Sequence, residues 1–226
     1  MYTTKLAIVL ASSAGLLFAA NEAEKRLTAA NTTIAEIMAS SDKGIPQDLL
    51  NKAACVVIVP GLKKGAFIVG GKFGRGFVLC RKDSGVGWSA PASIKVEGGS
   101  FGFQIGGQAV ELVMLIMNKD GMRHLLSSEF ALGADASVAA GPVGRHAEGN
   151  TDWKMRAEVL TYSRTRGLFA GVSLNGASIK QDKDSTREFY GRMVPFKTAL
   201  TGEIDPPAGS NAFLTSLAQW AQAAAK

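Results

Sequence analysis

The chain has 226 residues, of which 46% are hydrophobic and 19% are charged. This composition excludes an intrinsically disordered chain, and the length suits one domain that buries about 70% of its unfolded surface. The formal net charge is only +6. Without a DNA- or RNA-binding motif, this charge does not indicate a nucleic-acid-binding protein and instead favours anionic surfaces such as lipid headgroups.

Residues 1–20 are predicted to be a secretory signal peptide. Lys5 precedes an apolar run of 15 residues that ends at Ala20, and the sequence becomes polar at Asn21. The run is shorter than the about 20 residues that a membrane-spanning helix needs. We therefore expect export and a mature domain of residues 21–226; an uncleaved anchor or a buried helix is the alternative. No cysteine lies near Ala20, which excludes lipid attachment to a cysteine at this junction.

Two helices are predicted before residue 55. Residues 22–39 carry apolar side chains at helical spacing on one face and charged side chains elsewhere. This amphipathic helix either packs on the domain or lies on a membrane surface. A short second helix is expected over 46–54, because proline suits the first turn of a helix. The apolar face of the first helix comprises Ala23, Leu27, Ala30, Ile34, Ile37 and Met38.

From Cys55 onward the pattern changes to short strands. Four runs rich in β-branched and aromatic residues are separated by Pro60-Gly61, Gly74 and Asp83-Ser-Gly85, a spacing typical of antiparallel hairpins. Residues 153–159 alternate between apolar and charged side chains, which predicts a strand with one solvent-exposed face. Glycines within the apolar runs favour a bent sheet. The four early strands are expected over 55–59, 66–71, 75–81 and 87–96.

Three more helices are expected in the second half of the chain. The first covers about 119–130. The second runs through Tyr190, with Ser185 and Glu188 as a capping box. The third is capped by Ser210 and carries one apolar face. Together these elements predict an α+β fold, in which a strongly curved, mainly antiparallel and barrel-like β-sheet is packed by N- and C-terminal helices.

Cys55 and Cys80 are the only cysteines, and each lies in an apolar, strand-like run. If the protein is exported and the two strands are neighbours, a disulfide would stabilise the fold by about 3 kcal/mol. Two buried free thiols, which pack as small apolar groups, are the alternative.

One segment matches a pattern typical of a catalytic nucleophile. Residues 98–102 read G-x-S-x-G around Ser100. In serine hydrolases that motif joins a strand to a helix, whereas the residues after Ser100 alternate as in a strand. The only histidines, His124 and His146, lie in no partner motif. A serine hydrolase that uses Ser100 is therefore the least favoured function, and we predict a protein without enzymatic activity.

Motifs for cofactors and metals are missing from the sequence. It contains neither a P-loop nor a dinucleotide-binding glycine motif, and two distant histidines with two strand cysteines do not make a zinc site. Asp135 and Asp152 would either bind a cation or accept hydrogen bonds at turns and strand ends, of which the second is expected. The sequence therefore predicts no cofactor and no metal.

Four basic residues accompany the first two predicted turns. Lys63 and Lys64 follow one turn, and Lys72 and Arg75 flank the next. Two adjacent hairpin turns would place these four charges at one end of the sheet. Each cation near an anionic membrane contributes about 1 kcal/mol of attraction. A solvated rim of ordinary surface residues is the alternative.

Several glycine-rich segments resemble one known family. The longest is Tyr162-Ser-Arg-Thr-Arg-Gly-Leu-Phe-Ala-Gly-Val-Ser-Leu-Asn-Gly176, and Phe189-Tyr-Gly191 follows it. Two more precede it, over residues 98–107 and 132–144. In this order they are similar to the signature segments of SYLF domains. The resemblance covers about residues 24–205 and implies one SYLF-like domain over 21–226.

The resemblance implies binding of anionic lipid, which is phosphoinositide in eukaryotic members; these are also linked to actin and membrane trafficking. An exported bacterial protein of the periplasm or cell envelope would meet neither actin nor phosphoinositide, so the identity of the lipid stays open; phosphatidylglycerol, cardiolipin or another anionic glycerolipid fits the positive charge. Arg164 and Arg166 lie inside a matched segment, and arginine can bind phosphate through two hydrogen bonds. Their alternative role is a structural ion pair with Glu111 or Glu158. The candidate lipid-binding residues are Lys63, Lys64, Lys72, Arg75, Arg164 and Arg166.

The resemblance also bears on the cysteines and on a second class of function. Members of the family commonly have aliphatic residues where Cys55 and Cys80 stand, which favours two free thiols. The second class is a structural envelope protein that binds a protein partner, or its own copies, through glycine-rich sheet edges.

Overall fold

The computed structural model describes most of the chain from residue 22 onward. The predicted signal peptide of residues 1–20 lies outside the described residues, as do residues 153–156 of one predicted strand. The described residues are 22–40, 44–66, 69–82, 84, 87–101, 108–127, 129–143, 157–165, 168–169, 174 and 176–221.

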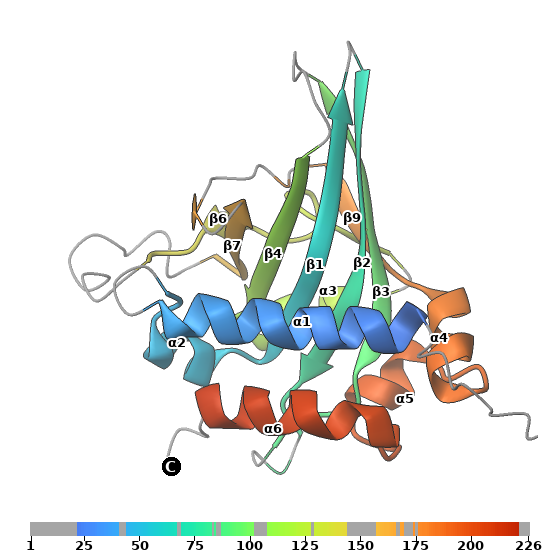
Figure 1. The fold of residues 1–226 in the computed structure, drawn as a ribbon. Coiled ribbons are helices and arrows are strands. Elements are labelled where there is room, and N and C mark those ends of the chain that lie inside the picture. Colours follow the sequence, from blue (N-terminus) through green and yellow to red (C-terminus); the bar gives the residue numbers. More distant parts are fainter. Residues whose placement is uncertain are drawn as a thin grey trace, which may run out of the picture.

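One curled sheet of nine strands forms the centre of the domain (Figure 1). Its strand order is β5-β9-β3-β2-β1-β4-β7-β6, and β8 pairs with β7. All pairs are antiparallel except β6 with β7. The predicted α+β class with a strongly curved, mainly antiparallel sheet is confirmed. The strands are β1 (Cys55–Ala66), β2 (Val69–Cys80), β3 (Ala92–Phe101), β4 (Gln108–Ile116), β5 (Glu129–Ala131), β6 (Val138–Ala140), β7 (Val159–Thr165), β8 (Leu168–Phe169) and β9 (Ala177–Gln181).

Helices from both ends of the chain cover one face of this sheet, as predicted. Figure 1 shows α1 and α6 running side by side across the lower half of the strands, while β1 and β2 extend well beyond them. No helix in the described part of the chain is both long and apolar enough to cross a membrane. The helices are α1 (Glu22–Ala39), α2 (Gln47–Lys52), α3 (Lys119–Leu125), α4 (Lys183–Tyr190), α5 (Phe196–Leu200) and α6 (Asn211–Trp220).

The apolar face of α1 packs on the domain. Leu27, Ile34 and Ile37 are buried and belong to the same core cluster as Phe213 and Leu217 of α6. Of the two roles open to an amphipathic helix here, the structure therefore shows packing, and this apolar face is not available to a membrane surface.

The sheet separates two apolar cores, because successive side chains of a strand point to opposite faces. On the convex face, Ile58 and Phe77 pack with the core formed by α1, α2 and α6. On the concave face, Val57 and Val78 pack with residues of α3, α5 and the strands β4, β5 and β9. Near the helices, β1 and β2 are therefore buried on both faces.

Cys55 and Cys80 form a disulfide with an S–S distance of 2.05 Å. The expectation of two free thiols is wrong. The register places the two residues directly opposite each other at the base of the β1–β2 pair, in the concave core. The sequence indicated two strands but not their register, which decides whether two cysteines can meet.

The two predicted turns at Pro60-Gly61 and Gly74 are also wrong, because β1 and β2 each continue through them. The pairing register of β1 with β2 shifts between Ile58 and Lys63. Such a bulge tolerates proline, which has no N–H for the ladder. A Cβ atom on Gly74 would lie 2.7 Å from Cγ1 of Val59. Glycine is therefore needed at position 74 for close packing of neighbouring strands, not for a turn.

Three later elements also differ from their predictions. The helix expected over 119–130 ends at Leu125, and β5 begins four residues later. The strand expected over 87–96 is β3, which begins at Ala92. The cap of α4 is Asp182 rather than Ser185, because the backbone N–H of Ser185 donates to Asp182 Oδ1 at 3.1 Å. Ser210 does precede α6, but its side chain makes no capping hydrogen bond.

Candidate functional site

The β1–β2 hairpin divides the predicted basic residues between the two faces of the sheet. Phe73 and Arg75 lie on the convex face of β2, and Lys72 lies on the concave face. Lys63 of β1 is the register partner of Phe73, and Lys64 is the register partner of Lys72. The four charges come from one half of one hairpin, as expected, but they belong to strands rather than turns and form two groups.

Lys63 and Arg75 line an open groove of about 370 Å³ between α1 and the hairpin. We call it the outer groove. Arg26 of α1 is its third cation, and its lining contains no acidic residue among those that the structure describes. The outer groove is lined by Arg26, Ala29, Pro60, Gly61, Lys63, Phe73, Gly74 and Arg75.

One buried carboxylate holds both arginines of the outer groove in place. Arg75 Nε lies 3.0 Å from Asp182 Oδ2, and the Asp182 side chain is only 4% exposed. Ser185 Oγ donates to the same oxygen at 2.8 Å and accepts a hydrogen bond from Arg26 Nη1 at 3.1 Å. Asp182 also caps α4. The groove is therefore attached rigidly to the folded domain, although it lies on the projecting part of the sheet.

The electrostatics of the outer groove favour an anion. Burial lowers the pKa of Arg26, and the nearby positive charge of Arg75 lowers it further. A lowered pKa means that the charged form of Arg26 is stabilised less here than in water. The charges of Asp182, Glu188 and Glu22 offset this lowering only in part. Because Arg75 pairs with Asp182, Arg26 donates to Ser185, and Lys63 adds a third cation, a bound phosphate or carboxylate would relieve the remaining repulsion.

Phe73 adds an exposed aromatic ring to these cations. It is 44% exposed, the most exposed large hydrophobic residue in the described part of the chain. The guanidinium carbon of Arg75 lies 5.7 Å from the centre of the Phe73 ring, within the range of a cation–π contact. An aromatic ring beside cations is a combination suited to the headgroup region of a membrane.

Lys72 is less available than Lys63. It is 9% exposed, and burial lowers its pKa. The structure describes the backbone of Lys64 as the partner of Lys72 but not its side chain. Of the four hairpin residues, Lys63 and Arg75 are therefore those that the structure places together at an accessible groove.

Arg164 takes part in a structural ion-pair cluster. It lies opposite Glu111 in the β4–β7 register, and its Nε is 2.5 Å from Glu111 Oε2. Its Nη2 donates to Glu36 of α1, so Arg164 links the sheet to that helix. The hydrogen bond with Glu111 raises the pKa of Arg164. Of the two acids expected as partners, Glu111 is the observed one, and Arg166 lies outside the described residues.

Ser100 lies within β3, where it is the register partner of Gly70. Because the strand continues through Phe101, the strand-to-helix turn that a G-x-S-x-G nucleophile needs is not formed at this position.

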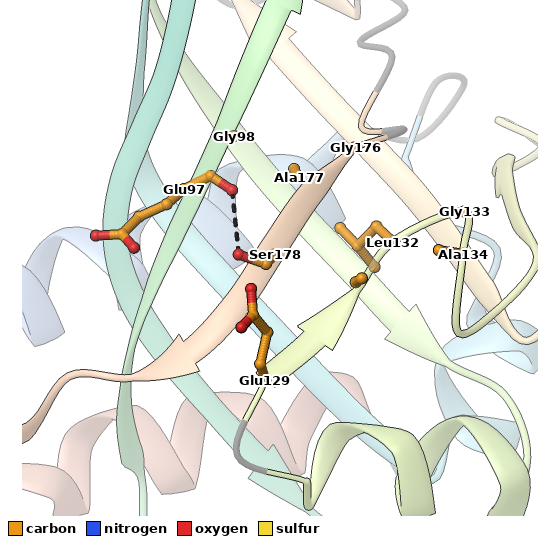
Figure 2. A pocket seen from close by; sticks show the side chains of 10 residues that line it. Glu97, Gly98, Glu129, Leu132, Gly133, Ala134, Gly176, Ala177 and Ser178 are labelled. Atoms are coloured by element: carbon orange, nitrogen blue, oxygen red, sulfur yellow. Dashed lines mark hydrogen bonds between the residues drawn. The ribbon is translucent and has the colours of Figure 1, made fainter.

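A second groove, of about 490 Å³, lies on the neighbouring strands β3, β9 and β5 (Figure 2). Two carboxylates, of Glu97 and Glu129, line it, and Ser178 Oγ lies 3.5 Å from the Glu97 carbonyl oxygen. A hydrogen bond from Lys180 lowers the pKa of Glu129. Since its charged lining among the described residues is acidic, this groove does not suit an anionic ligand.

Asp135 and Asp152 were each expected either to bind a cation or to accept hydrogen bonds, and the structure decides between these roles for Asp135. Asp135 Oδ2 accepts a hydrogen bond from the backbone N–H of Ala131 at 2.7 Å, a turn contact. Asp152 lies outside the described residues. Within the described ranges, no group of three or more His, Cys, Asp or Glu residues is arranged to hold a metal ion.

Sequence reasoning missed Arg26 and Asp182 as parts of the site. Arg26 stands on the polar face of the predicted first helix, where nothing local distinguishes it from Lys25. Asp182 is the N-cap residue of α4, three residues before Ser185. Aspartate is a favoured N-cap residue, and this preference was the available signal. Their convergence on Arg75 depends on how α1 and α4 pack against β2, and no local pattern reports that.

Comparison with known protein families gives one match over more than half of the chain. Residues 97–220 match the Ysc84 family, described as "Las17-binding protein actin regulator". The matched range runs from the second half of β3 to the end of α6 and therefore includes Asp182 and Arg164.

Curated relatives come from yeasts and animals. The chain is 37% identical over 172 residues to LAS seventeen-binding protein 3 of Saccharomyces cerevisiae, covering 74% of this chain and 37% of that protein. It is 38% identical over 169 residues to the human SH3 domain-containing YSC84-like protein 1, covering 74% and 48%. An SH3 domain-containing protein of Schizosaccharomyces pombe is 35% identical over 170 residues, covering 74% and 39%. The chain thus spans about half or less of the length of these relatives.

Proposed function

The chain belongs to the Ysc84, or SYLF-domain, family, and we propose that it binds anionic phospholipid at a membrane surface without catalysing a reaction. The observation that carries this proposal is the outer groove. Arg26, Lys63 and Arg75 converge there with no acidic residue in the described lining, beside the exposed ring of Phe73. The SYLF resemblance independently implies lipid as the ligand.

The position of the groove suits contact with the surface of a bilayer. The hairpin projects beyond the helices that cover the rest of the sheet (Figure 1), and α1 contributes only Arg26 and Ala29 to the groove. A bilayer at the groove would therefore contact the hairpin and this part of α1. Lysine and arginine near an anionic bilayer contribute about 1 kcal/mol each, and salt screens this attraction over a Debye length of roughly 10 Å. Phe73 would add apolar contact at the headgroup level. We therefore expect binding that requires lipid charge and weakens with salt.

Vesicle sedimentation with a charge-matched control tests this proposal. The outer-groove variant combines Arg26→Gln with Lys63→Ser and removes two positive charges. The control variant combines Lys82→Ser with Lys119→Ser, which removes two charges from exposed positions outside the outer groove. On vesicles rich in phosphatidylglycerol, we expect the outer-groove variant to bind roughly 30-fold more weakly, or about 2 kcal/mol.

The control variant should bind within about twofold of the parent, since non-specific charge loss at a distance is mostly screened. On neutral phosphatidylcholine vesicles neither variant should differ from the parent. Equal losses in the two variants would show that net charge alone causes binding and would refute a role for the outer groove.

We also propose that the protein works outside the reducing cytosol, in the periplasm or cell envelope. The Cys55–Cys80 disulfide supports this, because structural disulfides persist mainly in oxidising compartments. The apolar run before Asn21 in the sequence is in keeping with export. Mass spectrometry of the protein from fractionated cells would test both points. An N-terminus at Met1 together with reduced cysteines would contradict the proposal.

Binding of a protein partner is the second candidate function. The matched family is described as a Las17-binding actin regulator, and the yeast relative is named LAS seventeen-binding protein 3. Under this alternative, a pull-down should recover a defined partner, and vesicle binding should not depend on lipid charge. The third candidate is a serine hydrolase that uses Ser100. We expect a screen of acyl esters to find no turnover that depends on Ser100, whereas turnover that Ser100→Ala abolishes would support the hydrolase.

A further inference from the structure

A third groove shares Arg75 with the outer groove. We call it the side groove; it encloses about 750 Å³ between the strands β3 and β9 and the helices α4 and α5. Six basic residues line it, against the two acidic residues Asp182 and Asp184. The six are Arg75, Lys95, Lys180, Lys183, Arg187 and Lys197.

Three of these cations form a row across neighbouring strands. Arg75 of β2 is the register partner of Lys95 in β3, and Lys95 is the register partner of Lys180 in β9. Since adjacent strands lie about 4.8 Å apart, the row spans roughly 10 Å. Like charges directly opposite each other destabilise a sheet, so the row is not explained by the stability of the sheet.

Carboxylates at the edge of the row partly neutralise it. Lys95 Nζ lies 2.8 Å from Glu97 Oε1, and Lys180 Nζ lies 3.1 Å from Glu129 Oε1. Both lysine side chains remain about one-third exposed, at 33% and 34%. Exposed ion pairs of this kind are worth about 0–1 kcal/mol and exchange partners readily. The row can therefore accept carboxylates from another molecule at little cost.

The helices supply cations that the fold does not use. Lys183, at the start of α4, and Lys197, in α5, are exposed, and neither forms an ion pair with any residue that the structure describes. Arg187 is 57% exposed, with Asp184 at 3.1 Å. The groove also has an apolar part, formed by Leu126, Pro195 and Phe196. It thus combines a spread of cations with an apolar contact surface.

We propose that the side groove binds an acidic segment of another protein, with apolar residues interspersed among its carboxylates. The extent of the row favours this ligand over a small anion, which would need donors that converge on one point. The location argues against a membrane: α4 and α5 lie beside the lower, helix-covered part of the sheet, away from the projecting end of the hairpin (Figure 1). A bilayer at the outer groove would share only Arg75 with the side groove, whose other cations lie on β3, β9, α4 and α5.

Fluorescence anisotropy with a labelled synthetic peptide tests the inference. The probe alternates Glu and Ser and carries two Phe residues; its control has Gln in place of every Glu. The side-groove variant combines Lys183→Glu with Lys197→Glu, two exposed residues that hold no described ion pair, and thermal melting verifies that it folds. We expect the parent to bind the acidic probe and not the control. The variant should bind the probe about tenfold more weakly, because two exposed ion pairs between lysines of the protein and glutamates of the peptide are replaced by repulsion.

Vesicle binding separates this inference from the proposed lipid function. The side-groove variant should bind phosphatidylglycerol vesicles within about twofold of the parent, while Arg26→Gln with Lys63→Ser should retain the peptide. If the parent protein binds the acidic peptide but not the vesicles, only the lipid function would be refuted.

Three outcomes would overturn the inference. The first is no binding of the acidic probe by the parent. The second is binding of inorganic pyrophosphate as tightly as the peptide and with the same loss in the variant, which would make the groove a small-anion site. The third is loss of vesicle binding in the side-groove variant, which would make the groove part of a membrane surface.

Discussion

The two halves of the β1–β2 hairpin share their strands but differ in almost everything else. Near the helices, residues 55–59 and 76–80 are buried on both faces and joined by a disulfide. Further out, along residues 62–66 and 69–75, the described side chains of 71–75 alternate between exposed and buried, and Lys63 and Arg75 bring cations to the outer groove. The difference shows how one pair of strands anchors the fold at one end and presents a binding surface at the other. We call these the base half and the projecting half.

The largest expected contrast compares two phenylalanines on the same face of β2. Phe77→Ala in the base half should lower the free energy of unfolding by about 3–5 kcal/mol, because it removes a fully buried ring. Phe73→Ala in the projecting half should change it by less than about 0.5 kcal/mol. Urea denaturation of both variants measures the contrast. Similar losses would show that the projecting half is as essential to the fold as the base half.

The disulfide gives the next largest effect. Replacing Cys55 and Cys80 by Ala should lower the free energy of unfolding by about 3 kcal/mol, since the bond closes a loop with a sequence separation of 25. Because the bond lies in the base half, binding to anionic vesicles below the melting temperature should stay within about twofold of the parent. Calorimetry and sedimentation on the same samples would check this. Lost vesicle binding in a folded double variant would mean that the halves are not independent.

Arg164 tests whether a basic residue of the matched family segment is structural. Arg164→Ala should lower the free energy of unfolding by about 2 kcal/mol, because it leaves the partly buried Glu111 unpaired. Adding Glu111→Gln to that variant should restore part of the loss. A normal melting temperature combined with weakened vesicle binding would instead identify Arg164 as a lipid ligand.

The smallest expected effect concerns Lys72, on the concave face of the projecting half. Burial lowers its pKa, so charged Lys72 costs stability in the folded protein. Lys72→Met should therefore leave stability unchanged or raise it by less than about 1 kcal/mol. The difference between parent and variant should shrink as pH rises through the lowered pKa, where the unfolded chain binds more protons than the folded one. Melting curves at neutral and alkaline pH would reveal it; a destabilised variant at neutral pH would contradict this account.

Periodicity predicted the base of the fold well. The buried face of α1, including Leu27 and Ile34, follows directly from helical spacing. The class of the sheet followed from short β-prone runs. Strand lengths did not follow, because Pro60 and Gly74 are residues that usually end strands, and here a bulge and a close strand contact accommodate them.

The candidate site was predicted only in part. Lys63 and Arg75 were identified because they are basic residues close together in the sequence. Arg26 was not, since its proximity to Arg75 depends on how α1 crosses β2. The division of Lys63 from Lys72 depends on strand register, and so does the pairing of Cys55 with Cys80. Local sequence patterns do not report register, and for that reason these features required the structure.

Tryptophan quenching by brominated lipid tests most directly whether the projecting half contacts the membrane. Phe73→Trp places a probe at the outer groove. Met193→Trp is the matched control, because Met193 is also an exposed apolar residue, 36% exposed, but follows α4. With vesicles of brominated anionic lipid, we expect fluorescence beyond that of the parent to be quenched in Phe73→Trp and not in Met193→Trp. Quenching of the Met193→Trp probe alone, in protein that sediments with the vesicles, would contradict membrane contact by the projecting half.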